Sequence, residues 1–358
     1  MTIQPDDDIG RFDWAIKDLF NDAWRITLKN PAQAFFFLKA VRTQRRAARV
    51  RRYWSDKGVQ VPAVMIISVT NRCNLQCVGC YARALHRNPA SEMGEPELRK
   101  IIRDARALGV AIIFLAGGEP LIRSDVLKIT GDFPDIIFPL FTNGVLLDDE
   151  RFRILKRQKN VIPVLSLEGY QDETDDRRGN GVYERLRITI RKIKRLGIFW
   201  GISFTVTSLN FSLVVNEGYI KNLLVEGCRA FFFVEYVPVR DDTEGLVLTE
   251  EQKAQMVRLV NGFRSQIAGL FVMFPGDEEE YGGCLSAGRG FVHVNADGGL
   301  EPCPFAPYSD VSLKELTLKE ALQSEFLKKI RDHHNELKET AGGCALWAKR
   351  DWVRTILP

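Results

Sequence analysis

The fold of this chain is decided by the stretch SVTNRCNLQCVGCY at residues 68–81, which places Cys73, Cys77 and Cys80 in one short loop. The loop follows an apolar, β-branched run typical of a buried strand. In parallel α/β folds the functional face lies at the carboxyl ends of the strands. A structural zinc site usually uses two paired C-x2-C knuckles, and this loop supplies one. Three thiolates instead suit an iron-sulfur cluster whose fourth iron keeps an exchangeable position, with buried free thiols as the alternative.

Short apolar runs alternate with helical patterns along most of the chain, which predicts parallel strands joined by crossover helices. We expect strands at 64–69, 110–115, 136–141, 161–167, 200–206 and 230–237, and helices at 95–108, 124–131, 148–158, 182–196, 213–226 and 249–267. Six units are fewer than the eight that close a full barrel. The prediction is therefore an α/β fold: a partial (β/α)6 TIM-like barrel that either stays open on one side or has strands outside this pattern.

The rhythm changes near residue 268, where short strands with Gly and Pro turns surround Cys284 and Cys303, and a helix is expected at 315–332. We interpret this part as a small C-terminal α+β iron-sulfur domain. The predicted organisation is a helical, basic N-terminal extension at 1–60, a barrel at 61–267 and the small domain at 268–358.

The C-x3-C-x2-C spacing after the first strand of such a barrel resembles the radical SAM superfamily. The second strand ends in Gly117-Gly118-Glu119-Pro120, which is similar to the GGEP motif of that family. The resemblance implies that backbone groups there receive the amino group of S-adenosylmethionine, and glycine suits such a close approach. It also implies a [4Fe-4S] cluster held by the three cysteines.

Further along, Ser166-Leu167-Glu168-Gly169 resembles the SLDG segment of the family, and the resemblance implies that Ser166 binds the cofactor. Arg178 matches the arginine that pairs with the methionine carboxylate in anaerobic sulfatase-maturating enzymes, and a guanidinium fits a carboxylate bidentately. Arg177 is the alternative for that role, and a surface salt bridge is the alternative for both. Val237 stands where the family contacts adenine through its backbone.

One position departs from the family pattern. The family usually has an aromatic residue just before the third cysteine, beside adenine, whereas this chain has Gly79, with Tyr81 after the cysteine. The resemblance therefore does not indicate which residue of this chain contacts adenine on that side.

A second cysteine set has the spacing C-x13-G-x4-C, from Cys284 through Gly298 to Cys303, with Cys344 far downstream. It resembles the opening of the SPASM and twitch extensions of radical SAM enzymes, although the middle run of SPASM cysteines is missing. The resemblance implies one auxiliary [4Fe-4S] cluster held by Cys284, Cys303 and Cys344, with an open iron or an unrecognised fourth ligand. Buried thiols in a β-rich domain are the alternative.

The net charge of +4 conceals a local run of six arginines, namely Arg42, Arg45, Arg46, Arg49, Arg51 and Arg52. Together with the upstream phenylalanines, residues 31–54 form either a basic helix packed on the barrel or a helix that contacts a membrane or an anionic substrate. The N-terminal residues lack the pattern of a secretory signal, and no apolar run reaches the about 20 residues of a membrane span. We expect a cytoplasmic protein, peripheral to a membrane if this helix binds lipid, with no nucleic-acid partner.

The resemblance implies an oxidoreductase-type radical enzyme that cleaves S-adenosylmethionine reductively and abstracts hydrogen from a peptide, a small-molecule precursor or a lipid. It further implies an electron donor such as flavodoxin or ferredoxin. The alternatives are a non-catalytic iron-sulfur carrier or redox sensor and a structural zinc protein. No catalytic acid or base is identified, Cys228 is interpreted as core, and His293 as a hydrogen-bonded core histidine more readily than a ligand.

Overall fold

The structure, a computed structural model, describes the 358-residue chain except residues 1–7, 29–30, 86–90, 276–280 and 339–342. Its centre is a curled nine-stranded sheet in the order β7-β6-β5-β4-β3-β2-β1-β8-β9. The strands are β1 Val64–Thr70, β2 Ile112–Gly117, β3 Phe138–Thr142, β4 Val161–Ser166, β5 Gly201–Val206, β6 Ala230–Glu235, β7 Leu270–Phe274, β8 Phe291–Val294 and β9 Leu300–Glu301. All neighbouring pairs are parallel except β8 with β9.

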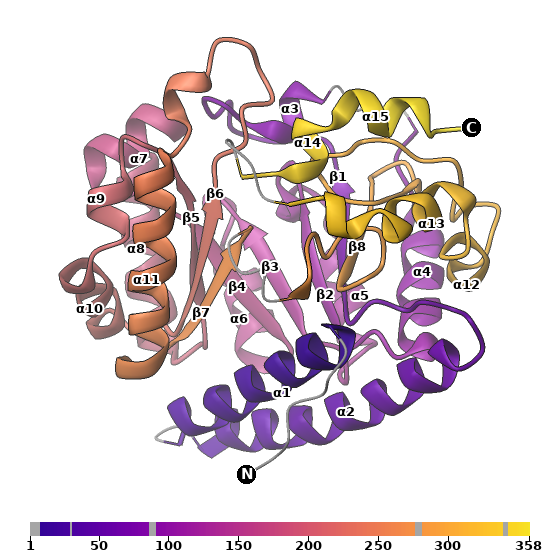
Figure 1. Cartoon of the computed structure of the whole chain (residues 1–358). Helices are drawn as coiled ribbons and strands as arrows, with labels where there is room; N and C mark the ends of the chain where they lie inside the picture. Colours follow the sequence, from indigo (N-terminus) through magenta and orange to yellow (C-terminus); the bar gives the residue numbers. More distant parts are fainter. Residues whose placement is uncertain (1–7, 29–30, 86–90, 276–280, 339–342) are drawn as a thin grey trace.

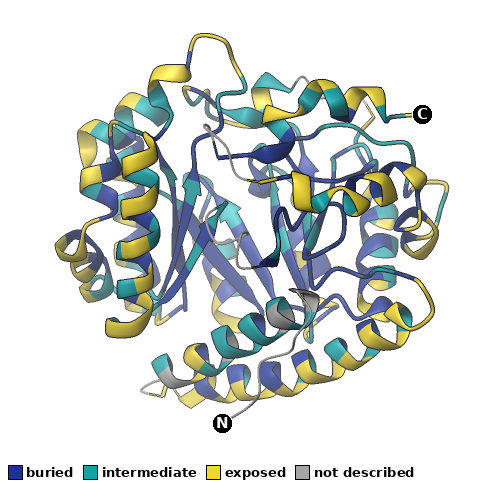
Figure 2. Ribbon diagram, viewed as in Figure 1, coloured by how far each residue is buried: buried dark blue, intermediate teal, exposed yellow. Residues whose placement is uncertain are grey.

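Crossover helices cover the outer face of this sheet (Figure 1). The helices are α1 Asp8–Ile26, α2 Pro31–Ser55, α3 Tyr81–Ala84, α4 Glu95–Leu108, α5 Val126–Gly131, α6 Asp149–Arg157, α7 Gln171–Arg178, α8 Val182–Leu196, α9 Phe211–Val214, α10 Glu217–Val225, α11 Glu250–Gln266, α12 Leu318–Ala321, α13 Glu325–Asp332, α14 Ala345–Ala348 and α15 Arg350–Thr355. Figure 2 shows the strands buried between these helices, whose outer faces are exposed. Both the strands and the helices follow the predicted alternation, so the partial TIM-like barrel is confirmed.

The sheet extends further than the six predicted strands. β7 continues the parallel series beyond β6, and β8 pairs with β1 on the other side, with Val64 opposite Phe291. The predicted boundary at 267/268 therefore falls between α11 and β7, and the sheet continues across it. The helix predicted at 315–332 is wrong as one element, because it is divided into α12 and α13, where Ser324 caps α13.

Helix α4 illustrates how sequence sets an element and its end. Its buried apolar residues recur every three or four positions, and the carboxylate of Glu97 accepts a hydrogen bond from the Gly94 amide at the first turn. The helix stops at Gly109, which has φ +92°, and a side chain there would meet the Ala47 carbonyl of α2 at 2.6 Å. Glycine therefore both ends α4 and permits α2 to pack closely.

Helices α1 and α2 lie across the amino-terminal ends of the strands (Figure 1). Phe37 of α2 is buried and packs edge-on against Phe199, with ring centroids 5.0 Å apart. The same apolar cluster includes Ile16 of α1 and the first residues of β1 and β6, Val64 and Ala230. The N-terminal extension is thus part of the barrel core. No helix within the described ranges is long and apolar enough to cross a membrane.

Candidate active site

The first cysteine loop lies at the carboxyl end of β1, against the end of β2. Backbone hydrogen bonds join them, from the Gly118 amide to the Thr70 carbonyl at 2.7 Å and from the Glu119 amide to the Arg72 carbonyl at 2.9 Å. A Cβ at Gly118 would stand 2.1 Å from the Arg72 oxygen. The two glycines of the predicted motif therefore let the loop and the strand end touch directly.

Glu119 and Pro120 hold this end of the sheet together. The buried Glu119 carboxylate accepts hydrogen bonds from the Leu121 amide, the Thr142 hydroxyl at 2.7 Å and the Asn143 amide at 2.8 Å. Burial raises its pKa in spite of these donors. Pro120 opens the short turn that follows. The Glu119 side chain ties β2 to β3, so the residue predicted to bind the cofactor also has a structural task.

The cysteines of this loop differ in exposure: Cys73 is exposed, and Cys77 and Cys80 are half-buried. Cys77 and Cys80 lie near enough to Cys73 for their negative charges to help raise its pKa, although partial desolvation of the Cys73 sulfur by the surrounding protein is the larger cause. A hydrogen bond of 2.8 Å from Asn143 to Asn74 fixes the loop to the end of β3. Three thiols gathered on one accessible loop form a donor set that fits an iron-sulfur cluster.

Arg178, at the end of α7, has a side chain that is only 10% exposed and lies beside this loop, with its Nη1 4.0 Å from the Cys77 sulfur. Its Nη2 pairs with Glu168, which also accepts hydrogen bonds from Arg177 at 3.1 Å and the Thr205 amide at 2.9 Å. Burial works against the charged guanidinium, but Glu168 and Cys77 raise the pKa of Arg178 above its ordinary value. The arginine therefore stays cationic at the cluster loop.

The Nε of Arg178 is buried and has no hydrogen-bond partner among the described residues. Such an orphan donor next to the cysteine loop fits an anionic ligand group, as the resemblance implies. The backbone carbonyl of Arg177, the alternative, accepts a hydrogen bond of 2.8 Å from the Val78 amide. Glu168 was not identified as a site residue from the sequence. The available signal was that Glu168 stands where the SLDG segment of the family has an aspartate.

Gly79, the departure from the family pattern, has φ +65° and faces the ring of Tyr236, the residue after β6. A Cβ at Gly79 would lie 2.6 Å from the Tyr236 hydroxyl oxygen. That hydroxyl is buried and has no partner among the described residues. The ring of Tyr236 therefore packs directly against the cysteine loop, and this close contact is possible only because residue 79 is a glycine. Tyr236 was missed because the sequence does not record this contact.

The remaining predicted cofactor residues lie on the same rim. Ser166 is the last residue of β4 and is half-buried. Val237 is buried, and its carbonyl accepts a hydrogen bond of 2.9 Å from the Val239 amide. The structure thus brings the predicted residues of strands β1, β2, β4 and β6 to one end of the sheet.

The second cysteine set is buried, and its three members are close together. Cys303 and Cys344 are neighbours that shift each other's pKa: Cys303 lowers the pKa of Cys344, whereas Cys344 and burial raise the pKa of Cys303. Cys284 is near enough to influence Cys303 electrostatically. The guanidinium of Arg289 donates to the carbonyls of Tyr281 and Cys284, both at 2.8 Å, and so fixes the Cys284 loop.

Within the described ranges, no three His, Cys, Asp or Glu side chains are close enough to hold a single metal ion. Cys228 is buried in the core as predicted, and burial raises its pKa. His293 is a hydrogen-bonded core histidine, again as predicted: Nε2 lies 2.8 Å from the Ser68 hydroxyl and Nδ1 lies 2.7 Å from Glu301. Glu301 was not foreseen as its partner.

Comparison with known proteins agrees with this geometry. Residues 67–212 match the family model described as "Radical SAM superfamily". An "AdoMet-dependent heme synthase" of Methanosarcina barkeri is 28% identical over 312 residues, which cover 79% of this chain and 88% of that protein. A "Probable GTP 3',8-cyclase" of Methanocaldococcus jannaschii is 27% identical over 267 residues, covering 66% and 83%.

Among solved structures, Streptococcus suis SuiB bound to S-adenosylmethionine superimposes with a TM-score of 0.64 at 16% identity, covering 86% of this chain and 74% of SuiB. At this identity the likeness establishes the fold alone. The cofactors of the family are a [4Fe-4S] cluster and S-adenosylmethionine, and the cysteine loop with Arg178 fits them. The chain therefore contains a radical SAM domain and is an enzyme of the radical SAM superfamily.

Proposed function

We propose that this enzyme abstracts a hydrogen atom from an unactivated carbon of its substrate. When bound, a [4Fe-4S] cluster and S-adenosylmethionine together supply a 5'-deoxyadenosyl radical for that step. In this chain Cys73, Cys77 and Cys80 would hold the cluster. The observation that carries the proposal is Arg178, held by Glu168 beside Cys77, whose buried Nε has no hydrogen-bond partner among the described residues.

The residues around the loop have separate tasks in this proposal. Arg178 pairs with the carboxylate of S-adenosylmethionine, and Gly117 and Gly118 offer backbone groups to its amino end. Ser166 and Val237 contact the rest of the cofactor from the ends of β4 and β6. Because these groups are buried or half-buried, they exclude water from the reacting atoms.

The second cysteine set supports an auxiliary [4Fe-4S] cluster on Cys284, Cys303 and Cys344. All three cysteines are buried and outside any disulfide, and Cys303 and Cys344 lie close enough for each to shift the pKa of the other. The fourth iron would remain open to substrate or to another side chain. We also propose a cytoplasmic location and a flavodoxin- or ferredoxin-type electron donor, since reduced thiols and a low-potential electron are both needed.

Relatives of this chain differ in their substrates. The names printed for them include a heme synthase and a GTP cyclase, and SuiB has been solved with the precursor peptide SuiA. These names support a peptide or a small-molecule precursor as the substrate class, and the basic helix α2 supports a lipid.

We further propose that the N-terminal helices contact an anionic membrane. The outer face of α2 carries the exposed arginines Arg42, Arg45, Arg46, Arg49 and Arg52, whereas Arg51 is buried and donates to the Gly109 carbonyl. Phe35 beside them is exposed. Binding to anionic liposomes at low salt, lost when the five exposed arginines are changed to glutamine, would support this contact, and no binding would remove it.

The test of the main proposal is anaerobic. The clusters are reconstituted, iron and sulfide are counted, and dithionite with S-adenosylmethionine is added while 5'-deoxyadenosine is measured. We expect this product from the wild type and none from Cys77→Ala. Iron without the product, with candidate substrates present, would favour the electron-carrier alternative.

A further inference from the structure

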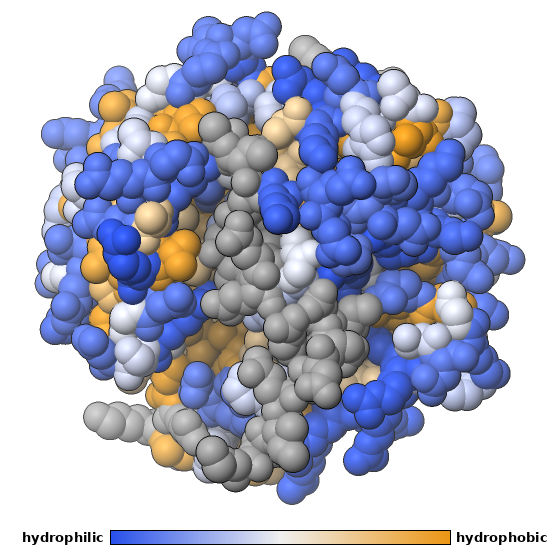
Figure 3. Space-filling model, viewed as in Figure 1, coloured by the Kyte–Doolittle hydropathy of each residue, from blue (hydrophilic) through white to orange (hydrophobic). Residues whose placement is uncertain are grey.

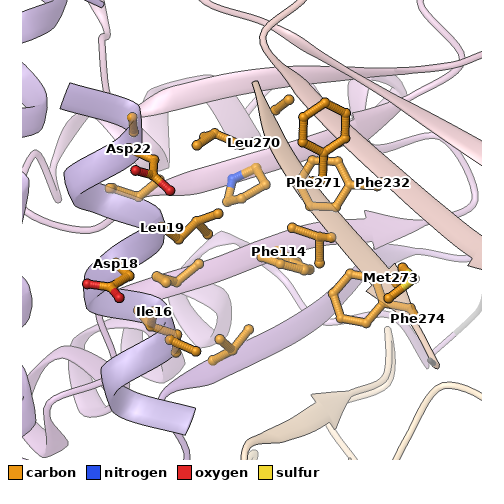
Figure 4. A pocket seen from close by; sticks show the side chains of 18 of the residues that line it. Ile16, Asp18, Leu19, Asp22, Phe114, Phe232, Leu270, Phe271, Met273 and Phe274 are labelled. Atoms are coloured by element: carbon orange, nitrogen blue, oxygen red, sulfur yellow. The ribbon is translucent and has the colours of Figure 1, made fainter. Parts of the chain in front are cut away.

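A large apolar cavity lies inside the barrel, between α1 and the amino-terminal halves of the strands. Its volume is about 660 Å³. Figure 4 shows Ile16 and Leu19 of α1 facing Phe114, Phe232, Phe271, Met273 and Phe274 across it. In Figure 3 hydrophobic atoms are visible in the hollow between α11 and α1. Protein interiors are normally filled to crystal-like density, so a void of this size is unusual as pure structure.

The wall of the cavity is almost entirely hydrocarbon. The inner faces of the strands contribute Ile66, Phe114 and Phe232, with Phe37 below them from α2. Phe114, Phe232 and Phe274 of this wall belong to one cluster of rings with Phe141, in which neighbouring centroids are 5.2 to 6.4 Å apart. The volume falls within the range of about 300 to 1,000 Å³ that is common for ligand sites.

The few charged groups at the cavity favour a hydrocarbon over an anionic molecule. Asp18 and Asp22 face it from α1, and among the described residues that line it Arg264 from α11 is the one basic side chain. Arg264 already donates to the Phe271 carbonyl at 3.1 Å and to Asn261 at 2.9 Å. A nucleotide triphosphate or a carboxylate-rich ring would face two carboxylates and little positive charge here. These ligands would lose their hydration without gaining partners.

The cavity and the cysteine loop are at different heights in the barrel. Ile66 lines the cavity, and β1 ends four residues later at Thr70, a rise of about 13 Å along the strand. A ligand that fills the cavity and also presents a carbon to the cysteine loop must therefore be long and thin. An extended hydrocarbon chain has this shape.

A surface next to the cavity fits the same ligand. Trp24 and Leu28 at the end of α1, and Phe35 and Leu38 on α2, are large apolar side chains that remain exposed. They lie on the two helices that close the cavity, beside the arginines of α2. Apolar residues flanked by arginines are the pattern of a helix that rests on an anionic lipid surface, from which a lipid chain could enter.

We propose that the cavity under α1 binds a long hydrocarbon chain of a lipid, and that this chain belongs to the substrate. The evidence for a binding site is the cavity itself. The statement that the hydrocarbon chain belongs to the substrate rests on the proposed function.

The test measures binding of cis-parinaric acid, a fluorescent C18 fatty acid, to the full chain with its clusters reconstituted. Two variants fill the cavity from opposite walls, Ala15→Trp on α1 and Val272→Trp on β7, since both residues line it. Matched controls place the same ring on exposed positions outside it, Ala32→Trp and Val225→Trp. Thermal melting checks that each variant folds.

We expect saturable binding to the wild type and both controls, and at least a tenfold weaker affinity in each folded cavity variant. No saturable binding to the wild type, or equal binding to the folded filled variants, would overturn the inference. Formation of 5'-deoxyadenosine is measured in the same samples. If 5'-deoxyadenosine forms but cis-parinaric acid does not bind, the proposed function stands and the cavity is not a site for a hydrocarbon chain. If the fatty acid binds but no 5'-deoxyadenosine forms, the cavity stands as a chain site and the proposed function fails.

Discussion

At the scale of single residues, the contact between Gly79 and Tyr236 explains the departure from the family pattern. The ring of Tyr236 stands where a side chain at position 79 would have to go, and Gly79 adopts a left-handed φ that favours glycine. Tyr236 also brings to the loop between Cys77 and Cys80 a buried hydroxyl that has no hydrogen-bond partner among the described residues. Such a hydroxyl is available to hydrogen-bond a ligand bound at the loop.

We predict that Tyr236→Phe weakens the binding of S-adenosylmethionine about two- to tenfold, as expected for the loss of one hydrogen bond of about 0.5–1.5 kcal/mol. Equilibrium dialysis against the cluster-loaded enzyme measures it, and iron content should not change. Tyr170→Phe, at an exposed tyrosine, is the control. Unchanged affinity in Tyr236→Phe would show that the hydroxyl is not used.

Arg178 and Arg177 share Glu168, but only Arg178 is next to a cysteine sulfur. We predict that Arg178→Lys lowers the affinity for S-adenosylmethionine at least tenfold, about 1.4 kcal/mol, because an ammonium cannot reproduce the planar fork. Arg177→Lys should have a smaller effect. The same dialysis compares the two variants, and a larger loss in Arg177→Lys would reverse the assignment.

The buried Glu119 gives a pH-dependent prediction for the iron-free chain. Burial raises its pKa in the fold, so the native state binds its proton more tightly than the unfolded chain. The stability that protonated Glu119 contributes to the fold is fully present below its ordinary pKa near 4.5. It is lost as the pH rises through the raised pKa of the folded state. We expect Glu119→Gln to reduce this loss, measured by urea unfolding at several pH values. Glu150→Gln, an exposed carboxylate, should leave the pH profile unchanged.

At the scale of elements, what could be predicted depended on how local the signal was. The alternation of β-branched runs and helical spacing identified β1 to β6 because each pattern lies within one short segment. β8 was read as an apolar strand of another domain, since its pairing with β1 joins residues more than 200 positions apart. The cysteine spacings located both sets, whereas Glu168 and Tyr236 became site residues only through contacts across the barrel.

Helix α2 offers a matched pair of substitutions. Phe37 is 1% exposed and packs on Phe199 under the barrel, whereas Phe35 is 71% exposed. We predict that Phe37→Ala lowers the free energy of unfolding by about 3–5 kcal/mol, as for other buried phenylalanines. Phe35→Ala should change it by less than about 0.5 kcal/mol. Chemical denaturation measures both, and similar effects would contradict the packing of α2 as a barrel floor.

At the scale of the whole molecule, the two cysteine sets meet across the rim of the barrel. The ring of Tyr81, next to Cys80, contacts Phe305 with centroids 5.0 Å apart. Glu235 at the end of β6 lies against Gly343, where a Cβ would stand 2.5 Å from its carboxyl carbon. The following residue, Tyr236, touches the first loop. The end of β6 thus contacts residues that neighbour cysteines of both sets, and the proposed auxiliary cluster would lie on the same rim as the first loop.

This arrangement leads to a prediction on metal content. If each set holds a [4Fe-4S] cluster, the reconstituted wild type should bind about eight irons per chain. Cys303→Ala should bind about four and keep the spectroscopic change that S-adenosylmethionine causes at the first cluster, because Cys73, Cys77 and Cys80 remain. Cys228→Ala is the matched control, since Cys228 is also buried but precedes the amino end of β6, opposite to the rim that carries the first loop. Iron analysis with electron paramagnetic resonance reads both properties. Four irons in the wild type would remove the auxiliary cluster and leave the second set as buried thiols, whereas eight irons in Cys303→Ala would remove Cys303 from the ligands of that cluster.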